Sequence, residues 1–232
     1  TPPDNLIGLG LAAQMQGTAR DPFPVGGVVS RVETQVDDNP WRVAQVVSAP
    51  GADGTVTWQQ SWTLPAEEGV THLVRVRAVD AAGNVGQASE AVKVTIDNVN
   101  PQSSVVSPQP DTVLPEPGQT VLPGEMLAWG YATDGWGISS VELSVDGGLT
   151  WHTAATGQAA AELVGRYGKA AAASATAELW AIVLPTPVGD VMVNSRASDC
   201  AGNVEGMKAP VRITQTHEPP MRLWFPLIVH SY

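Results

Sequence analysis

Residues that could carry out metal or acid–base chemistry are few and scattered in this sequence. The chain has four histidines: His72, His152, His217 and His230. None is spaced as H-x-H or HExxH, so the sequence predicts no tetrahedral metal site. A G-x-S-x-G motif and a P-loop are also missing, and GLGLAA (8–13) is an incomplete dinucleotide fingerprint. We therefore expect no cofactor and no enzymatic activity.

Aspartates near expected turns are the other candidate ligands. They are Asp37, Asp38, Asp134, Asp146 and Asp199. Clustered carboxylates suit Ca²⁺, a hard cation that prefers several oxygen ligands. Single aspartates at turns also accept hydrogen bonds from backbone amides, and we favour this turn-capping role. Cys200 is the sole cysteine, which excludes an internal disulfide, and we expect it to be a small buried apolar residue.

The composition is that of an acidic globular chain with many turns. Of its 232 residues, 43% are hydrophobic and 15% are charged, so a packed core is expected. The 23 glycines and 19 prolines favour short strands joined by turns. The net charge is −11 and no run of Lys or Arg occurs, which argues against nucleic acid as a partner. No apolar run reaches the roughly 18 residues of a membrane span.

The sequence repeats itself. The phrase RAVDAAGNVG (77–86) recurs as RASDCAGNVE (196–205), and its flanking blocks recur in the same order. The block VKVTIDNVNP (92–101), for example, corresponds to VRITQTHEPP (211–220). Two homologous domains are therefore expected, with a boundary near Pro101.

Alternating apolar residues identify the repeated blocks as strands. In THLVRVRAVD, Val74, Val76 and Ala78 alternate with Arg75 and Arg77, so one face lies in a core and the other in water. The Asp-x-Ala-Gly-Asn-Val phrase that follows is a turn. We predict an all-β fold of two tandem immunoglobulin-like (Ig-like) β-sandwich domains, plus a C-terminal extended strand.

The predicted domains are residues 1–100, residues 101–219 and a hydrophobic tail, 220–232. The second domain carries an alanine-rich insertion at 154–177. The insertion is either a short helix around Ala159–Val164 or a surface loop, and it is either a contact surface or an addition without a role.

Large aromatic residues recur at matching places in the two copies. Trp41 and Trp151 are equivalent, whereas Trp58, Trp62 and Trp180 precede the Leu-Pro blocks. We expect them to pack in the sandwich cores, because buried aromatics cover much area. The alternative is an exposed tryptophan that stacks on carbohydrate.

The order of these blocks resembles a known family. VELSVDGGLTWHTA (141–154), a Trp-containing strand, Leu-Pro and VRVRAVDAAGNV (74–85) resemble bacterial Ig-like (E-set) domains. They are similar in particular to the C-terminal dimerisation domain of sulfite-oxidase-type molybdenum enzymes. This resemblance implies a sandwich fold. The molybdopterin domain has no counterpart here, so it implies no redox activity.

A shorter motif points to a hairpin. SVDGGLTW (144–151) matches the Asp-box pattern of sialidase-like propellers, in which it forms a structural hairpin. A propeller needs several copies, and this chain has one with a degenerate partner. We therefore interpret it as a hairpin on a sandwich, in which Asp146 caps the turn and Trp151 packs under it.

The two copies differ most at their starts. SSVVSP (103–108) precedes the shared blocks of the second copy as a first strand, and the first copy is shorter by about one strand and a turn. A sandwich without an edge strand exposes unpaired backbone that accepts an added strand. The first domain is therefore predicted to lack its first strand.

The tail has the opposite property. Pro220 aligns with Pro101, so MRLWFPLIVHSY (221–232) occupies the place of a further first strand. An extended segment that is apolar on both faces should not stay in water. We expect it to complete the first domain of another molecule, which would build a ring or a filament. The predicted donor-strand residues are Leu223, Trp224, Phe225, Leu227, Ile228 and Val229.

Two other roles for the tail remain open. It could fold back on its own domain, or it could be a sorting or anchoring signal. FPLIVHSY (225–232) resembles the short C-termini of some exported bacterial proteins, which implies an extracellular or cell-surface location.

The sequence thus predicts a structural surface protein that self-assembles head to tail. Its main partner is itself, with other surface proteins or glycans as further partners. The alternative is an accessory, carbohydrate-binding sandwich module of a larger secreted enzyme.

Overall fold

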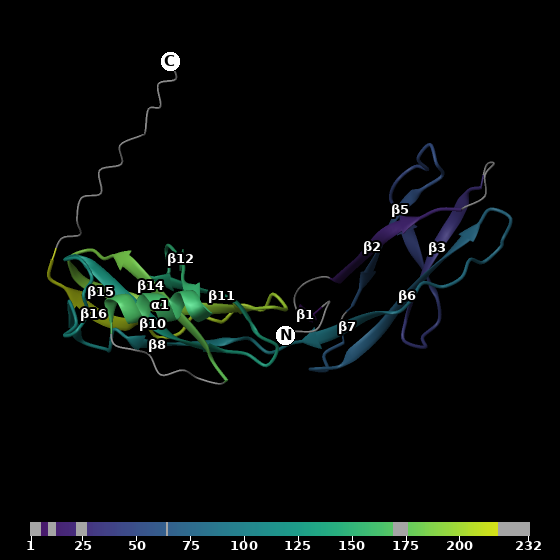
Figure 1. The fold of residues 1–232 in the computed structure, drawn as a ribbon. Coiled ribbons are helices and arrows are strands. Elements are labelled where there is room, and N and C mark those ends of the chain that lie inside the picture. The colour runs from purple at the N-terminus through teal and green to yellow at the C-terminus, as the bar shows by residue number, and fades with distance from the viewer. Residues whose placement is uncertain (1–5, 9–12, 22–26, 64, 169–175, 218–232) are drawn as a thin grey trace, which may run out of the picture. The chain divides into compact units, whose positions relative to one another are not determined.

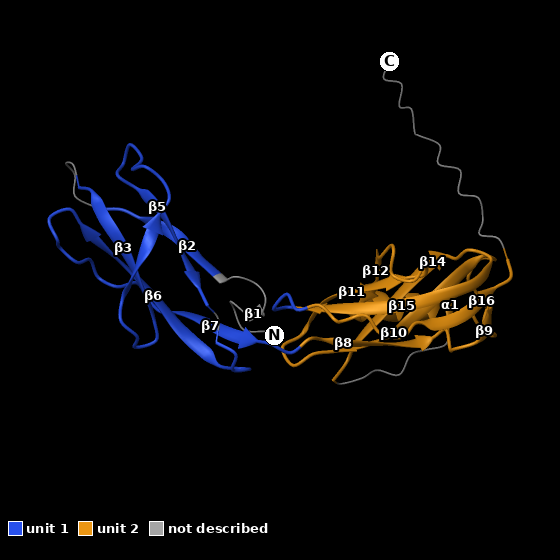
Figure 2. Ribbon diagram, turned by 180° about the vertical axis from the view of Figure 1, so that it is seen from behind, with its two compact units in different colours: residues 1–99, 200–203 blue, residues 100–199, 204–232 orange. Residues whose placement is uncertain are grey.

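The structure, a computed structural model, describes residues 6–8, 13–21, 27–63, 65–168 and 176–217. The chain divides into two compact units (Figures 1 and 2). Unit 1 comprises residues 1–99 and 200–203, and unit 2 comprises residues 100–199 and 204–232.

Both units are Ig-like β-sandwiches, so the predicted all-β fold class is confirmed. The tail lies outside the described residues, and with it the predicted donor strand, Leu223, Trp224, Phe225, Leu227, Ile228 and Val229. The described part of the chain contains no helix that is long and apolar enough to cross a membrane.

Unit 1 is built from one sheet whose strand order is β1-β7-β6-β3-β4-β5-β2. Its strands are β1 (Leu6–Gly8), β2 (Ala13–Ala19), β3 (Val29–Val36), β4 (Arg42–Val46), β5 (Val56–Trp62), β6 (Thr71–Asp80) and β7 (Val92–Asp97). The sheet curls so that strands β2 to β6 contribute side chains to one small core. The buried members of this core are Val29, Val32, Ala44, Val56 and Trp58.

Unit 2 has two sheets, ordered β13-β14-β10-β8 and β12-β11-β15-β16-β9. Its strands are β8 (Gln102–Ser107), β9 (Thr112–Leu114), β10 (Glu125–Thr133), β11 (Ile138–Ser144), β12 (His152–Thr153), β13 (Ala155–Thr156), β14 (Glu178–Pro185), β15 (Gly189–Asp199) and β16 (Val211–Gln215). The sheets enclose a larger core, in which Trp180 is completely buried.

The two units repeat one topology. β1 pairs in parallel with β7 as β9 pairs with β16, and β2 pairs with β5 as β10 pairs with β14. Gly17 lies opposite Trp58 as Gly130 lies opposite Trp180, which fixes the residue equivalence. β8 of unit 2 has no counterpart among the strands described for unit 1.

The alanine-rich insertion forms helix α1 (Gly157–Tyr167), so the helical alternative is confirmed. It lies along the outer face of β14 and β10 (Figure 1). Ala160 and Val164 are buried against Ala181 of β14. The helix ends where the amide of Gly168 donates to the carbonyl oxygen of Val164 at 2.9 Å. Because α1 covers one face and the facing sheet covers the other, the sequence EMLAWGYAT of β10 shows no apolar–polar alternation.

The repeated phrase forms the same corner in both units. Val79 bridges to Val85 and Ser198 to Val204, which closes a strand-turn-strand connection. In unit 1, Asp80 accepts the amide of Asn84 at 2.8 Å. The predicted turn is therefore confirmed.

A cation–π contact occurs at equivalent positions in the two units. The guanidinium of Arg77 lies 4.1 Å from the ring centre of Trp41, and that of Arg196 lies 4.1 Å from Trp151. These two tryptophans are thus half-buried beneath arginines outside the cores, whereas Trp58 and Trp180 are core residues as predicted.

Candidate strand-acceptor site

Strand β2 is an edge strand among the residues that the structure describes. It pairs with β5 on one side, whereas its equivalent β10 pairs with β14 on one side and β8 on the other. The β8 pairing covers Trp129–Thr133 of β10. In unit 1 the corresponding stretch, residues 16–20, has no strand on that side among the described residues. We call this stretch the acceptor edge.

Two hollows border the acceptor edge. One, of about 180 Å³, is lined by Arg20 and by Ala78 and Gly86 of the repeated corner. The other, of about 440 Å³, is bordered by Gly17 and Trp58. The first hollow leaves space at the Arg20 end of the acceptor edge, whereas the second lies over the paired strands β2 and β5.

The inner row of β6 is incompletely covered. Val74, Val76 and Ala78 are half-buried, whereas their equivalents on β15, Val193, Ser195 and Ala197, are fully buried. The difference arises because β8 lies against β15, where the hydroxyl oxygens of Ser103 and Ser195 are 2.9 Å apart. Covering the β6 row with apolar side chains would contribute about 25 cal/mol per Å² of buried area.

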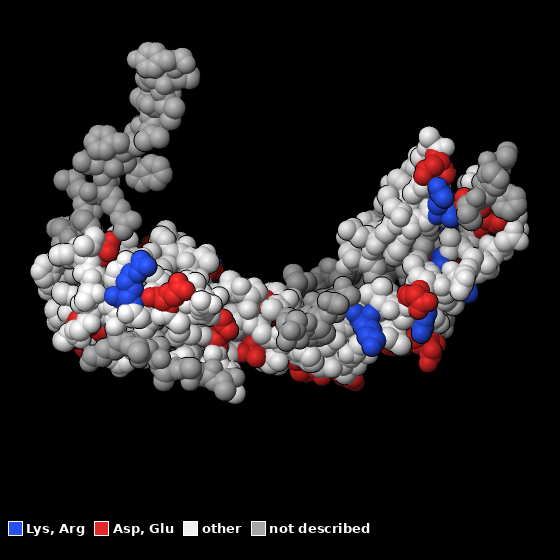
Figure 3. Space-filling model, in the orientation of Figure 1, with Lys and Arg blue, Asp and Glu red and all other residues white. Residues whose placement is uncertain are grey.

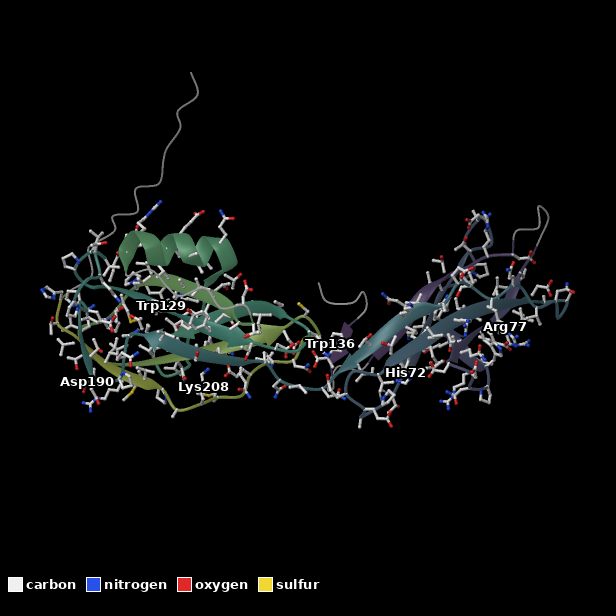
Figure 4. The ribbon with its side chains drawn as sticks, turned by 60° about the horizontal axis from the view of Figure 1, so that its bottom comes forward. His72, Arg77, Trp129, Trp136, Asp190 and Lys208 are labelled. Carbon is white, nitrogen blue, oxygen red and sulfur yellow. The ribbon has the colours of Figure 1, made fainter. Side chains whose placement is uncertain are left out.

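A charged cluster holds β8 in place in unit 2. The carboxylate of Glu205 accepts the amides of Ser103 and Ala197, each at 3.0 Å, and pairs with Lys208 at 2.8 Å (Figure 4). In the aligned first copy, Gly86 stands for Glu205 and Ser89 for Lys208. Unit 1 therefore has no equivalent of these two charges.

A glycine makes room for β8. A Cβ atom added to Gly130 would overlap the carbonyl oxygen of Ser104, so only glycine permits the close approach of this strand. The equivalent Gly17 meets no neighbouring backbone, and the nearest atom is a Trp58 ring carbon at 3.0 Å. Unit 1 thus retains the glycine that a first strand requires, beside an edge where the described structure has none.

Charge does not mark this site. On the face that Figure 3 shows, basic and acidic side chains are interspersed over unit 1. Arg20 at the end of the acceptor edge makes only a long, exposed ion pair with Asp53, 3.9 Å apart. Such a pair contributes little to stability. Recognition here would rest on backbone hydrogen bonds and apolar contacts.

Two of the sequence-predicted aspartates are turn caps. Asp146 accepts the amides of Leu149 and Thr150 at 3.0 and 2.9 Å. The Thr150 hydroxyl and then its amide hold the pKa of this carboxyl far below its usual range. Asp134 accepts the amides of Trp136 and Gly137.

Asp37 follows β3, but its carboxylate accepts the amide of Leu73 in β6 at 2.9 Å, across the strand pair. Turn capping is therefore confirmed for Asp134 and Asp146, whereas the side chain of Asp37 links β3 to β6. The prediction of a buried thiol is wrong, because Cys200 is exposed on the turn of its corner, as Ala81 is in the first copy.

A family model matches this architecture. Residues 93–216, just over half of the chain, match the Mo-co oxidoreductase dimerisation domain. The chain belongs to this family. The match runs from β7 to the end of the strands described for unit 2. It therefore covers the complete sandwich, and the resemblance found in the sequence is confirmed.

Individual relatives share parts of the chain. Sulfite oxidase from Gallus gallus is 35% identical over 94 residues, which is 39% of this chain and 19% of that protein. The chain thus spans about a fifth of this relative's length. Fibronectin(III)-like modules of Clostridium thermocellum CbhA align with 91% of this chain and 89% of theirs, at 15% identity and a TM-score of 0.47. The sulfane dehydrogenase SoxCD from Paracoccus pantotrophus aligns with 56% of this chain and 27% of its own, at 23% identity and a TM-score of 0.33.

The residues of the acceptor edge were not predicted from the sequence. The shorter first copy indicated that a strand was absent. It did not indicate which strand lacks a neighbour, because the length of a copy does not determine which strands pair. The aligned glycines, Gly17 and Gly130, were the available signal, because an invariant glycine in two copies marks a close backbone approach.

Proposed function

We propose that this chain is a non-catalytic self-association module that joins its copies by strand addition. In this proposal the tail of one molecule, residues 221–232, pairs with the acceptor edge of unit 1 in another. The observation that carries it is the open edge of β2 at the place where β10 of unit 2 holds β8.

The position of the tail in the repeat supports it as the donor. In the first copy, β7 is followed by Pro101 and then by β8. In the second copy, β16 is followed by Pro220 and then by the tail. The tail therefore stands in the chain where β8 stands, one repeat later.

The apolar character of the tail also fits the surroundings of the acceptor edge. The tail is rich in large apolar residues, and the acceptor edge lies beside the half-buried valines of β6. Natural edge strands are commonly protected by Lys, Pro or a bulge. Strand β2, AQMQGTA, carries none of these residues, so its edge is unprotected against pairing.

Strand addition gives affinity through main-chain hydrogen bonds and specificity through alternate side chains. A tail that binds the opposite unit of a neighbour forms a heterologous contact, which propagates into a ring or a filament. The family's description as a dimerisation domain supports self-association in general. An extracellular or cell-surface location forms part of the proposal and rests on the resemblance of the tail to exported C-termini.

Sedimentation velocity on three variants tests the proposal. The full chain should form concentration-dependent oligomers, and deletion of Met221–Tyr232 should leave monomers. Gly17→Ala should also leave monomers while unit 1 stays folded, because the added methyl group blocks a strand that approaches as β8 approaches Gly130. Thr18→Ala is the matched control, since it changes an exposed side chain of the same strand and leaves the edge open.

A synthetic peptide of residues 221–232 provides the converse experiment. It should bind the deletion variant and compete with assembly of the full chain. Oligomers that persist after the deletion, or that are unaffected by Gly17→Ala, would contradict the proposal.

A further inference from the structure

A cavity of about 320 Å³ lies inside unit 1, away from the acceptor edge. Its walls come from strands β2 to β6 and from loop residues between them, such as Asn39 and Pro65. His72 lines it at the start of β6, six residues from Ala78 at the acceptor edge, or about 20 Å along a strand.

The same region of unit 2 is solid core. The equivalents of Thr34, Gln60 and His72 are apolar and buried. They are, in that order, Leu143, Ile182 and Val191. Unit 1 has therefore replaced three aliphatic core residues by polar ones and kept an empty volume between them. Polar residues at core positions lower the free energy of unfolding. Such departures from apolar core packing are expected at functional sites.

His72 is held in a fixed orientation. Its Nδ1 lies 2.8 Å from Oδ2 of Asp37, and Oδ1 of Asp37 accepts the amide of Leu73. The hydrogen bond from His72, followed by that from the Leu73 amide, lowers the pKa of Asp37. With a carboxylate as its partner, Nδ1 carries the proton, so Nε2 of the neutral ring is an acceptor. Nε2 is buried and has no hydrogen-bond partner among the described residues.

Trp62 completes this arrangement. Its ring meets the ring of His72 edge to face, with centroids 5.5 Å apart and an interplanar angle of 87°. Trp62 also lines the cavity, where it adds a rigid apolar surface. This tryptophan was predicted as a core residue, yet it is half-buried at the cavity.

The remaining polar groups of the wall are mostly uncharged. Asn39, Gln60, Ser61 and Thr63 offer amides and hydroxyls that both donate and accept. The wall carries one carboxylate, that of Asp37, which accepts the hydrogen bond of His72 Nδ1, and one guanidinium, that of Arg42. A volume of this size is at the lower end of the range for small-ligand sites.

We infer that this cavity binds one sugar ring of a glycan. Hydroxyl groups both donate and accept hydrogen bonds, which suits the uncharged amides and hydroxyls of the wall. The side-chain oxygen of Gln60 takes one sugar hydroxyl, and that of Asn39 takes another. The C–H face of the ring packs on Trp62. This inference is independent of self-association, since it concerns a different part of unit 1.

Isothermal titration of the full chain tests it. The probes are D-glucose, D-galactose, D-mannose and N-acetyl-D-glucosamine at millimolar concentration, each also as its disaccharide, with citrate as an anionic comparison. At least one neutral sugar should bind, and its binding should alter the fluorescence of the wild-type chain but not of Trp62→Phe.

Variants that restore the core of unit 2 make the test specific. The double variant Gln60→Ile with His72→Val fills the cavity with the residues of unit 2 and should weaken sugar binding at least tenfold. Its unfolding midpoint should equal or exceed that of the wild type, which separates lost binding from misfolding. Thr57→Ile, on the exposed outer face of the same strand, is the matched control and should bind normally.

Three results would overturn the inference. They are the absence of binding by every neutral sugar, binding of citrate alone, and sugar binding that survives in the double variant. None of them bears on oligomer formation by the tail, which sedimentation reports separately.

Discussion

The two units of this chain share a topology and differ in how completely it is covered. Unit 2 has a first strand on the edge of one sheet and a helix on the outer face of that sheet. Unit 1 has neither among its described residues. The comparison separates the residues that both sandwiches share from those whose character depends on the presence of β8 and α1.

The outer faces show this dependence most clearly. In unit 2, helix α1 covers apolar residues of β10 and β14, and Trp129 lies beneath it (Figure 4). The equivalent residues on β2 and β5 of unit 1 are polar. The side chain of Gln59 accepts a hydrogen bond from Gln14 at 2.8 Å and donates one to Gln45 at 3.2 Å. The face of unit 1 is therefore suited to water. Its edge is not, since β2 lacks the charges and prolines that protect a free edge.

The inserted helix thus has a structural role. Its position is explained by the apolar residues under it, which would otherwise be exposed. The expectation that the insertion is a contact surface is not required to explain its presence.

The largest predicted difference between the units lies in their cores. Trp180→Ala should lower the free energy of unfolding of unit 2 by about 3–5 kcal/mol, because the ring is completely buried in a closed core. Trp58→Ala should cost unit 1 less, since its core is smaller and partly open. Urea unfolding, monitored by amide hydrogen exchange in each unit, measures the two losses of unfolding free energy. Equal losses would contradict the view that unit 1 is incompletely packed.

The paired glycines give the next effect. Gly130→Ala should destabilise unit 2 by about 1–3 kcal/mol, because the methyl group displaces β8. Gly17→Ala, made in the tail-deleted chain, should lower the free energy of unfolding of unit 1 by less than Gly130→Ala lowers that of unit 2, because only the Trp58 ring must shift. The same unfolding measurement compares them. A larger loss for Gly17→Ala would mean that its edge is already occupied.

The charged cluster around Glu205 comes third. Glu205→Gly places the residue of the first copy in the second and should cost unit 2 about 1–3 kcal/mol, since it leaves the amide of Ser103 without its acceptor. Amide exchange of β8 should accelerate while that of β14 changes little. Glu162→Ala on the exposed side of α1 is a suitable control. Unchanged exchange in β8 would show that the strand is held by other contacts.

Acid should affect unit 1 through two carboxylates. Hydrogen bonds from Arg31 and Arg77 lower the pKa of Glu33, and those from His72 and Leu73 lower the pKa of Asp37. Their stabilisation is therefore complete above the ordinary values of 4.5 and 3.8 and is lost as the pH falls through the lowered ones. Glu33→Gln should flatten this acid loss, as followed by amide exchange of β3. A loss that is equally steep in the variant would assign the acid sensitivity to other groups.

The smallest effect tests what the two units have in common. Arg77→Lys and Arg196→Lys each weaken a cation–π contact of the same length and should each cost about 0.5–1 kcal/mol. Thermal unfolding should therefore give similar small shifts for the two. A large difference would show that the equivalent corners have diverged in energy as well as in sequence.

The repeats made much of the fold predictable from sequence. Strands such as β6 alternate apolar and polar residues, so their faces could be assigned without coordinates. Strand β10 could not be assigned in this way, because both of its faces are buried and its apolar residues are continuous. Helix α1 was one of two alternatives, since alanine-rich segments suit helices and loops alike.

The candidate sites were less predictable, since strand pairing creates them. Asp37 and His72 are 35 residues apart and meet only because β3 pairs with β6. The alignment of the copies nevertheless contained a signal. Where the second copy has the core residue Val191, the first has a histidine, which is an improbable substitution for packing alone. Differences between the two copies at core positions therefore mark the cavity wall.

Hydrogen–deuterium exchange of β2, measured in the full chain and in the chain without Met221–Tyr232, tests the open edge most directly. At concentrations where the full chain sediments as oligomers, the amides of the acceptor edge should be protected, and the deletion should expose them while β5 stays protected. Fast exchange at this edge in both proteins, or equal protection in both, would contradict strand addition by the tail.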